Sequence, residues 1–245
     1  MHLSGNTVLI TGGSSGIGLA LARQFQIHNN RVIITGRDGA KLASAEKELP
    51  GIHTFRTDHT DPASAISLRD YISEHHPALN VLINNAGVQY SYAFGHDPAS
   101  AGNIATETQI NFIAPLLLTN ALLPFLTGQP ASAIVFVSSA LYIAPKRSAP
   151  VYCATKAAIH TFAKALRYQL EGSSVKVFEI IPPLVDTAMT TDRSSSGKMS
   201  TDRLARIFIR NFHSDDTEQY IGKSRLLKML SRISPRLAES MMKNG

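Results

Sequence analysis

The sequence has little of what stabilises small secreted proteins. Its 245 residues include one cysteine, Cys153, and no tryptophan. A single thiol excludes an internal disulfide and a cysteine-ligated metal cluster, and it is typical of a reducing compartment. The histidines, His75 and His76 among them, lack metal-ligand spacing, so we expect no metal and interpret these two as surface or space-filling residues.

Targeting signals and negative charge are also scarce. We expect neither a signal peptide nor a membrane span, because we find no basic segment before a long apolar one and no stretch of sufficient length, and we expect a cytoplasmic protein. Residues 1–197 carry 14 Lys/Arg against 13 Asp/Glu, whereas residues 198–245 carry 10 against 5. Only the C-terminal segment is therefore basic, and we expect no nucleic-acid partner.

Short apolar runs alternate with helix-length stretches. This alternation predicts an α/β protein with a parallel sheet covered on both faces. We expect one doubly wound, Rossmann-type domain, with a dinucleotide-binding and catalytic core at 1–187, and a short substrate lid and basic C-terminal segment at 188–245. Pro62 predicts the first position of the third helix. The predicted strands are 7–11, 31–35, 52–56, 80–83, 133–138 and 175–181; the predicted helices are 16–29, 38–48, 62–75, 103–127 and 152–171.

A glycine-rich turn follows the first predicted strand. In TGGSSGIG, Gly12 permits a tight turn, Gly16 permits close approach of a pyrophosphate, and Gly18 permits the helix to approach the strand. The free N–H groups of the helix N-terminus would bind the phosphates. A plain Gly/Ser turn is the alternative. The candidate pyrophosphate-binding residues are Gly12, Ser14, Ser15, Gly16, Ile17 and Gly18.

The end of the second predicted strand indicates which dinucleotide binds. An acidic residue there would bind the ribose hydroxyls of NAD, but this chain has Gly36 followed by Arg37. A guanidinium can pair with a 2′-phosphate, which predicts NADP(H). Asp38 could instead contact a ribose, so NAD(H) stays an alternative, and Arg37 could be a solvated loop charge.

Tyr152 and Lys156 lie four residues apart and so on one face of a predicted helix. A free tyrosine has a pKa of about 10, too high for ready proton exchange near neutral pH. The Lys156 ammonium would favour the phenolate and lower that pKa. Taken alone, the pair could be ordinary helix surface.

The chain resembles the short-chain dehydrogenase/reductase family over about residues 5–190. The resemblance is carried, in order, by TGGSSGIG at 11–18, TDHTD at 57–61, NNAG at 84–87, Asn111, Ser139 and YCATK at 152–156. The segment PPLVDT also resembles a bacterial branch of oxidoreductases associated with lipoteichoic-acid D-alanylation operons. The resemblance implies a homodimer or homotetramer acting on a small-molecule carbonyl or alcohol.

The resemblance also implies roles for particular residues. Tyr152 would be the acid/base, Lys156 its activator and a ligand of the nicotinamide ribose, Ser139 the group that binds the substrate carbonyl, and Asn111 a proton-relay residue. Ser138 would face away by strand alternation. The remaining implied cofactor contacts are Asp58, His59, Asn85, Ala86, Gly87, Val185 and Thr187, with Asn84 structural.

Two segments depart from the family pattern. Pro183 stands where glycine is usual, which stiffens the loop. The short, polar region 188–200 occupies the position of the substrate lid and is expected to be mobile. We expect the substrate pocket to be lined by Gln89, Tyr90, Tyr92, Leu141 and Tyr142, and Cys153 to be a small packed side chain.

The C-terminal segment is amphipathic. Pro235 breaks or restarts its helix. Two interpretations stay open: a terminal helix packed on its own core or on a subunit partner, and a basic helix that contacts anionic lipid. Its apolar residues at helical spacing are Leu226, Leu230, Ile233, Leu237 and Met241.

Together these observations predict an NADP(H)-preferring oxidoreductase that interconverts a carbonyl and an alcohol. A 3-oxoacyl carrier-protein reductase is an alternative within the same class. A nucleotide-sensing protein that kept the fold and lost turnover is an alternative of another class, because a fold does not determine function. A scaffold for nucleic acid or membrane would depend on the basic segment alone.

Overall fold

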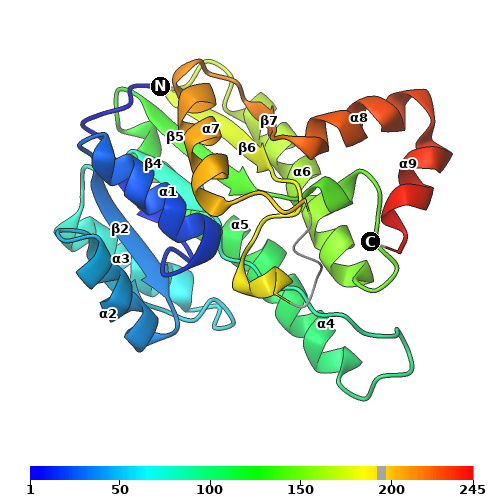
Figure 1. The fold of residues 1–245 in the computed structure, drawn as a ribbon. Coiled ribbons are helices and arrows are strands. Elements are labelled where there is room, and N and C mark those ends of the chain that lie inside the picture. The colour runs from blue at the N-terminus through cyan, green and yellow to red at the C-terminus, as the bar shows by residue number, and fades with distance from the viewer. Residues whose placement is uncertain (192–196, 245) are drawn as a thin grey trace.

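The computed structural model describes residues 1–191 and 197–244 and contains a seven-stranded parallel sheet (Figure 1). The strand order is β3-β2-β1-β4-β5-β6-β7, and every neighbouring pair is parallel. The prediction of a doubly wound α/β fold is confirmed. The strands are β1 Thr7–Ile10, β2 Arg31–Gly36, β3 His53–Arg56, β4 Val81–Asn84, β5 Ser132–Val137, β6 Val175–Ile181 and β7 Glu218–Tyr220.

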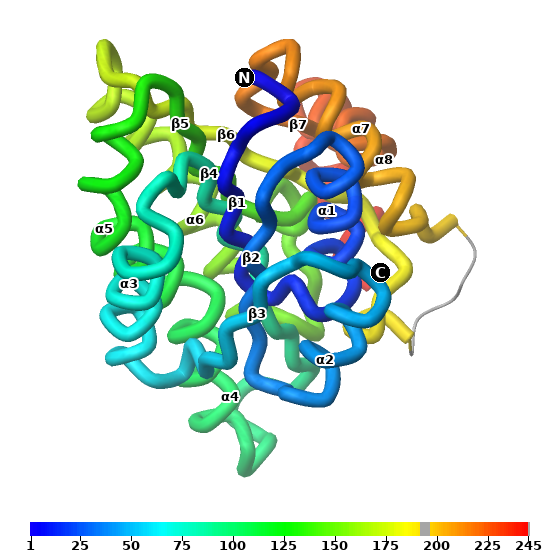
Figure 2. Tube along the Cα trace, turned by 90° about the vertical axis from the view of Figure 1, so that its left-hand side faces the viewer, coloured from blue at the N-terminus to red at the C-terminus, as the bar shows by residue number. Residues whose placement is uncertain are grey.

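Helices cover both faces of the sheet (Figure 2). Alternation along β1 sends Val8 and Ile10 into one core with α1, α2 and α7, and Leu9 into the other core with α3, α5 and α6. Fully burying each such side chain contributes about 1.5–3 kcal/mol. The helices are α1 Gly16–Ile27, α2 Gly39–Glu48, α3 Ser64–His75, α4 Ser100–Thr108, α5 Ala114–Thr127, α6 Pro150–Gln169, α7 Thr201–His213, α8 Lys223–Ile233 and α9 Pro235–Met242.

Three predicted helix boundaries are wrong. The third helix begins at Ser64 rather than Pro62, because the Asp61 side chain accepts the N–H of Ala63 and forms a turn first. The stretch 103–127 is interrupted by a π-helix, Gln109–Ile113, between α4 and α5. The helix predicted from residue 152 begins at Pro150, which suits a first helical position.

The expectation that no stretch reaches the length of a membrane span is also wrong. Within the described residues, the helical stretch Ser100–Thr127 is long and apolar enough by length and composition, with a mean hydropathy of 1.6. One side of it is covered by the protein, since Leu118, Leu122 and Leu126 lie in the core beneath α5.

The C-terminal segment forms β7, α8 and α9, and the two helices stand at the end of the molecule opposite α2 (Figure 1). Leu227 and Ala238 pack with Ala140 and Ala144, so the interpretation of a tail packed on its own core is confirmed for this face. Pro235 restarts the helix after Ser234. The predicted stripe, however, is largely exposed: of its five residues, only Leu230 is partly buried, whereas Leu226, Ile233, Leu237 and Met241 are exposed.

The predicted lid is described only in part. Its first residues form a short 3₁₀ turn, Ala188–Thr190, in which the Thr187 and Thr190 side chains cap each other's backbone. Residues 192–196 of the region 188–200, for which the sequence predicts mobility, lie outside the described residues.

Candidate active site

Two adjoining hollows lie beyond the carboxyl ends of the strands, where ligands bind in open α/β sheets. The first, here called the cleft, has a volume of about 570 Å³ and runs from Arg37 at its outer end along the glycine turn to Lys156. The second, the apolar cavity, has a volume of about 1010 Å³ and lies between Ser139 and the C-terminal helices. Tyr152 lines both, so the two hollows meet at this residue.

The glycine turn forms one wall of the cleft. Gly12 and Gly16 have φ values of +63° and +57°, which favour glycine. A Cβ on Gly18 would lie 2.4 Å from the carbonyl oxygen of Gly12, so this glycine allows α1 to approach the turn. Ser15 precedes α1 without capping it through its side chain. Of the predicted pyrophosphate-binding residues, all line the cleft except Gly18, which has this packing role.

The outer end of the cleft carries positive charge. Arg37 and Lys41 line it; sequence analysis missed Lys41, although its position one helical turn after Arg37 could have indicated it. The Asp38 side chain caps α2 by accepting the N–H groups of Ala40 and Lys41, at 2.9 and 3.1 Å. A Cβ on Gly36 would lie 3.0 Å from the Ser14 hydroxyl, so this position has little room for an acidic side chain.

The loops after β3 and β4 form the floor of the cleft, which Asp58, His59, Asn85, Ala86 and Gly87 all line. Thr60 donates its backbone N–H to Asp58 and so holds the pKa of that carboxyl below its usual value, while burial lowers the pKa of His59. Asn85 donates to the carbonyl oxygens of Thr11 and Gly12 and joins this floor to the glycine turn.

Asn84 turns away from the cleft. Its side-chain amide donates to the hydroxyl of Thr119 on α5 at 3.1 Å, and both residues are buried. This contact ties β4 to the helix behind it, in keeping with the structural role expected from the sequence.

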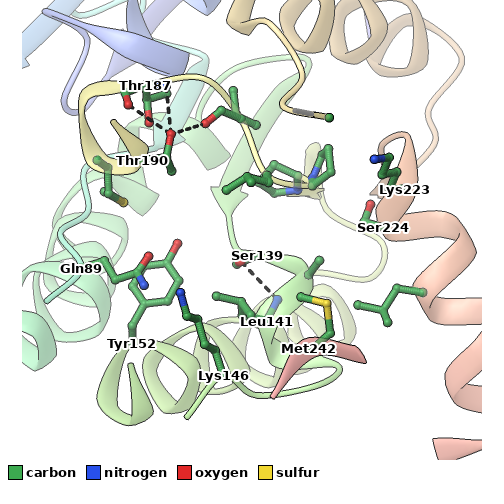
Figure 3. A pocket seen from close by; sticks show the side chains of 18 of the residues that line it. Gln89, Ser139, Leu141, Lys146, Tyr152, Thr187, Thr190, Lys223, Ser224 and Met242 are labelled. Carbon is green, nitrogen blue, oxygen red and sulfur yellow. Dashed lines mark hydrogen bonds between the residues drawn. The ribbon is translucent and has the colours of Figure 1, made fainter. Parts of the chain in front are cut away.

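Helix α6 brings Tyr152 and Lys156 to the meeting point of the hollows. The Lys156 ammonium donates to the carbonyl oxygen of Val137 at 2.8 Å and lies 5.6 Å from the centre of the Tyr152 ring. Complete burial lowers the pKa of Lys156 to about 8, against an opposing effect of the charge of Glu179. Tyr152 and Ser139 both line the apolar cavity, as Figure 3 shows.

Asn111 lies in the π-helix between α4 and α5, a local irregularity that is frequent at functional sites. Its side chain is buried and bonds to both the N–H and the carbonyl of Val88 at 2.8 Å, and to the hydroxyl of Thr155 at 3.3 Å. A Cβ on Gly87 would lie 3.3 Å from Asn111 and 3.6 Å from the Lys156 ammonium, so there is little room for a side chain at this position.

A buried acidic residue lies behind the site, and sequence analysis missed it. Glu179 on β6 is 1% exposed and accepts hydrogen bonds from the Ser138 hydroxyl at 2.5 Å and from the His160 ring at 2.8 Å. Ser138 therefore points away from the cavity, as strand alternation predicted. The signal was present, because one carboxylate inside the apolar run VKVFEII must find partners when that strand is buried.

The predicted pocket lining is partly wrong. Gln89 and Leu141 line the apolar cavity and Tyr90 lines the cleft, but Tyr92 and Tyr142 line neither. Tyr92 is buried with its hydroxyl 3.3 Å from Glu107. Tyr142 stacks on the His160 ring and bonds to Tyr220.

Sequence analysis also missed the far wall of the cavity. Leu226, Leu227 and Leu230 of α8 and Met241 and Met242 of α9 line it. These residues lie more than seventy positions after Tyr152 in the sequence, and no local spacing rule applies at that separation.

The remaining predicted residues lie nearby. Thr187 lines both hollows, whereas Val185 lines only the apolar cavity and pairs with Met199 in an isolated β-bridge. Pro183 lines the cavity. Cys153 is buried beside Tyr152 in a small apolar cluster, and burial raises the pKa of its thiol.

Residues 6–198 match the family described as short chain dehydrogenase, and the chain belongs to this family. The "Uncharacterized oxidoreductase DltE" of Bacillus subtilis (strain 168) is 46% identical over 189 residues, covering 77% of this chain and 75% of that protein. The predicted family is thus confirmed, and this similarity agrees with the resemblance of the PPLVDT segment.

Two further comparisons are informative. "Sulfoacetaldehyde reductase 2" of Chromohalobacter salexigens is 33% identical over 207 residues, covering 81% of this chain and 80% of that protein. A short chain dehydrogenase from Burkholderia cenocepacia J2315, solved in complex with NADP, covers 100% of both chains with a TM-score of 0.87 at 20% identity, which shows the shared fold.

Proposed function

We propose that the protein is an NADP(H)-preferring oxidoreductase that interconverts a carbonyl and an alcohol. The observation that carries this proposal is the position of Tyr152, which lines the cleft together with Lys156 and lines the apolar cavity together with Ser139. A side chain at the meeting point of a cofactor site and a substrate site can exchange a proton with the atom that undergoes hydride transfer.

The residues of the cleft fit a dinucleotide. Gly12 and Gly16 leave space above the turn where side chains would intrude, and the first N–H groups of α1 can bind a pyrophosphate. Asp58, His59 and the segment Asn85–Ala86–Gly87 would border the adenine and ribose, with Thr187 and Lys156 toward the nicotinamide. The nicotinamide, when bound, supplies or accepts the hydride. The NADP in the Burkholderia cenocepacia relative supports this assignment.

The preference for NADP(H) follows from charge at the outer end of the cleft. Arg37 and Lys41 offer two cations for a 2′-phosphate. Asp38, the residue that could have favoured NAD(H), accepts two N–H groups at the start of α2. Swinging it toward a ribose would leave the helix uncapped, at a cost of about 1 kcal/mol.

The catalytic steps follow from the side chains around Tyr152. The Ser139 hydroxyl donates to the substrate carbonyl oxygen and polarises it, while the Tyr152 hydroxyl donates the proton that this oxygen requires as the alcohol forms. Lys156 stabilises the resulting phenolate. Asn111 bonds to the Val88 backbone and to Thr155, the residue before Lys156, and we assign it to the relay that returns a proton to Tyr152.

The cavity beside Tyr152 favours an enzyme over a nucleotide sensor, because a sensor needs no second hollow that reaches the acid/base pair. The sulfoacetaldehyde reductase relative supports carbonyl chemistry as the reaction type. The proposal extends to a homodimer or homotetramer, as the family resemblance implies.

Calorimetry with NADPH and NADH tests the assignment, on the unaltered protein, on Arg37→Ala and on Arg31→Ala as a matched control. We expect NADPH to bind more tightly and Arg37→Ala to narrow the difference by about ten- to a hundred-fold. Arg31 is exposed at the start of β2 and does not line the cleft, so its substitution should change nothing. Equal binding of both cofactors would overturn the NADP(H) preference, and binding of neither would overturn the cofactor site.

A further inference from the structure

The apolar cavity is built unlike a site for a small polar carbonyl. Its volume of about 1010 Å³ lies at the upper end of the range for ligand pockets. Leucine and methionine side chains of α8 and α9 form its far wall, and a short aldehyde at Tyr152 would leave this wall without contacts. These side chains are Leu226, Leu227, Leu230, Met241 and Met242, and Leu141 lines the cavity nearer Ser139.

The side chains of Gln89, Ser139 and Tyr152 line one side of this cavity, and Lys223 and Ser224 at the start of α8 add polar groups on the side across from them (Figure 3). Figure 3 shows Gln89, Tyr152 and Ser139 around that side, with Met242 and α8 beyond them. A ligand that places its carbonyl between Ser139 and Tyr152 must therefore extend its remaining atoms toward α8 and α9.

We infer that the substrate is a carbonyl compound, or the corresponding alcohol, that carries a large apolar part such as a long alkyl chain or fused rings. This inference rests on the proposed function and names the substrate class of the same site. Each buried methylene contributes about 0.8 kcal/mol, close to four-fold in affinity, until the wall is covered.

Methyl ketones from butanone to dodecanone, with NADPH, test this class through kcat/KM. We expect kcat/KM to rise about two- to four-fold per methylene over several steps. Leu227→Trp, which fills part of the cavity, should reduce kcat/KM for dodecanone at least ten-fold more than it reduces kcat/KM for butanone. The matched control is Leu237→Trp, an exposed position on α9 outside the cavity lining.

A binding experiment separates this inference from the proposed function. Because the natural chain has no tryptophan, Leu226→Trp places a single fluorescent indole at the cavity, and Ile233→Trp places one on the same helix outside it. Dodecanone should change the fluorescence of the first variant only, with a Kd well below that of butanone. Such binding without turnover would overturn the proposed reaction and keep the substrate class; equal binding of short and long ketones, or no binding, would overturn the class.

A different observation concerns the outer surface of α8 and α9. Large apolar side chains are exposed along it, with Leu226 at 65%, Met229 at 56%, Ile233 at 82% and Met241 at 62% exposure. Leu226 and Met241 also line the cavity, so the exposed surface is continuous with the cavity wall. We call this surface the α8–α9 stripe; it comprises Leu226, Met229, Ile233, Leu237 and Met241.

The charges beside the stripe identify its occupant. Residues 223–243 carry one acidic residue, Glu239, among six basic ones. A second copy of the chain docked through the same surface would bring these cations together, which is unfavourable, whereas an anionic surface would pair with them. The basic residues are Lys223, Arg225, Lys228, Arg232, Arg236 and Lys243. Lys228 is paired with Glu218 and Lys223 lines the cavity, so the remaining exposed cations beside the stripe are Arg225, Arg232, Arg236 and Lys243.

We propose that the α8–α9 stripe rests on an anionic lipid surface, with the cavity wall at the point of contact. Exposed apolar side chains flanked by arginine and lysine are the features by which amphipathic helices bind the interface of such membranes. The contact would present the cavity to molecules dissolved in the lipid.

Co-sedimentation with vesicles tests this proposal. Vesicles of phosphatidylglycerol and phosphatidylcholine should retain the protein, and phosphatidylcholine alone or high salt should release most of it. Ile233→Glu should lower retention at least five-fold, whereas Ile66→Glu, at another exposed apolar position on α3, should not.

Two outcomes would overturn the lipid contact. One is equal retention by neutral and anionic vesicles, or by Ile233→Glu and the unaltered protein. The other is a dimer that light scattering detects in solution and that Ile233→Glu dissociates, because the stripe would then be an interface between two copies.

Discussion

The cleft and the apolar cavity share Tyr152, yet they are built in opposite ways. The cleft is made of loops at the ends of neighbouring strands together with polar side chains, and positive φ angles at Gly12 and Gly16 shape it. The cavity is closed by leucine and methionine side chains from α8 and α9, far along the chain. The cleft thus depends on local motifs that any dinucleotide requires, whereas the cavity depends on tertiary packing specific to this chain.

The largest effect is expected from substitution of Lys156, the lysine that lines the cleft. Lys156→Met removes the cation beside Tyr152 while keeping the length of the side chain, so turnover should fall by roughly a thousand-fold. Long ketones should still bind the cavity, because Lys156 does not line it. Steady-state kinetics and the Leu226→Trp fluorescence titration would measure the two effects; loss of ketone binding would contradict the separation of the hollows.

The same variant makes a prediction for stability. The pKa of Lys156 is about 8 in the folded protein and about 10.5 for a lysine in the unfolded chain, so between these values the unfolded chain binds more protons. Stability of the unaltered protein should therefore rise by roughly 3 kcal/mol as pH increases through this window. Lys156→Met should lack this rise in urea unfolding experiments, and an identical pH dependence would show that Lys156 does not titrate there.

A glycine substitution tests whether the cleft depends on close packing at Gly18. Gly18→Ala places a Cβ 2.4 Å from the Gly12 carbonyl oxygen, so it should destabilise the protein by about 1–3 kcal/mol and weaken NADPH binding. Gly102→Ala in α4, where a Cβ meets nothing within 4 Å, should instead stabilise by about 0.5–1 kcal/mol. Thermal unfolding and calorimetry would measure both; equal effects would contradict the packing role of Gly18.

The buried carboxylate of Glu179 should influence how kcat depends on pH. The charge of Glu179 opposes the effect of burial on the Lys156 pKa, so in Glu179→Gln that pKa should fall further. The alkaline limb of kcat should then move to lower pH by about one unit, and Glu179→Asp should restore part of the shift. A purely structural role would lower kcat at every pH and leave the limb in place.

The smallest effect on turnover is expected at a histidine far from both hollows. His76 is 3% exposed, and burial lowers its pKa to about 4, below the 6.5 of a free histidine. The unfolded chain binds more protons between these values, so stability should rise with pH across this window. His76→Gln should flatten that rise, while His75→Gln, at a half-exposed side chain, should not; unfolding by urea at several pH values would decide.

The residues that the sequence grouped as a cofactor site mostly line one cleft, because the determinants of their placement are local. A glycine turn after a strand, a missing acid before Arg37 and the Tyr152–Lys156 spacing each constrain nearby backbone, and nearly all of these residues line one hollow. The absence of an acidic residue at position 36 has a second explanation that only the structure shows. The Ser14 side chain occupies the space beside Gly36, where an acidic side chain would lie.

The parts that sequence analysis missed depend on contacts between distant segments. Helical spacing in the C-terminal segment indicated one apolar stripe, but it could not tell which residues face Ala140 and which face outward. Tyr92 and Tyr142 are close in sequence to residues that line the hollows. The Tyr92 hydroxyl, however, bonds to Glu107 and the Tyr142 hydroxyl bonds to Tyr220, and both partners lie on other elements. Hydrophobic periodicity predicts which face of a helix is apolar, but it does not predict which element packs against that face.

The central claim, that Tyr152 transfers a proton to a carbonyl held between two hollows, is tested most directly by NADPH consumption with a long-chain methyl ketone. The unaltered protein should consume NADPH, and Tyr152→Phe should lower the rate by roughly a thousand-fold with unchanged binding of NADPH and ketone. Tyr168→Phe, exposed on the same helix, serves as the control. Equal rates for Tyr152→Phe and the unaltered protein would contradict the account.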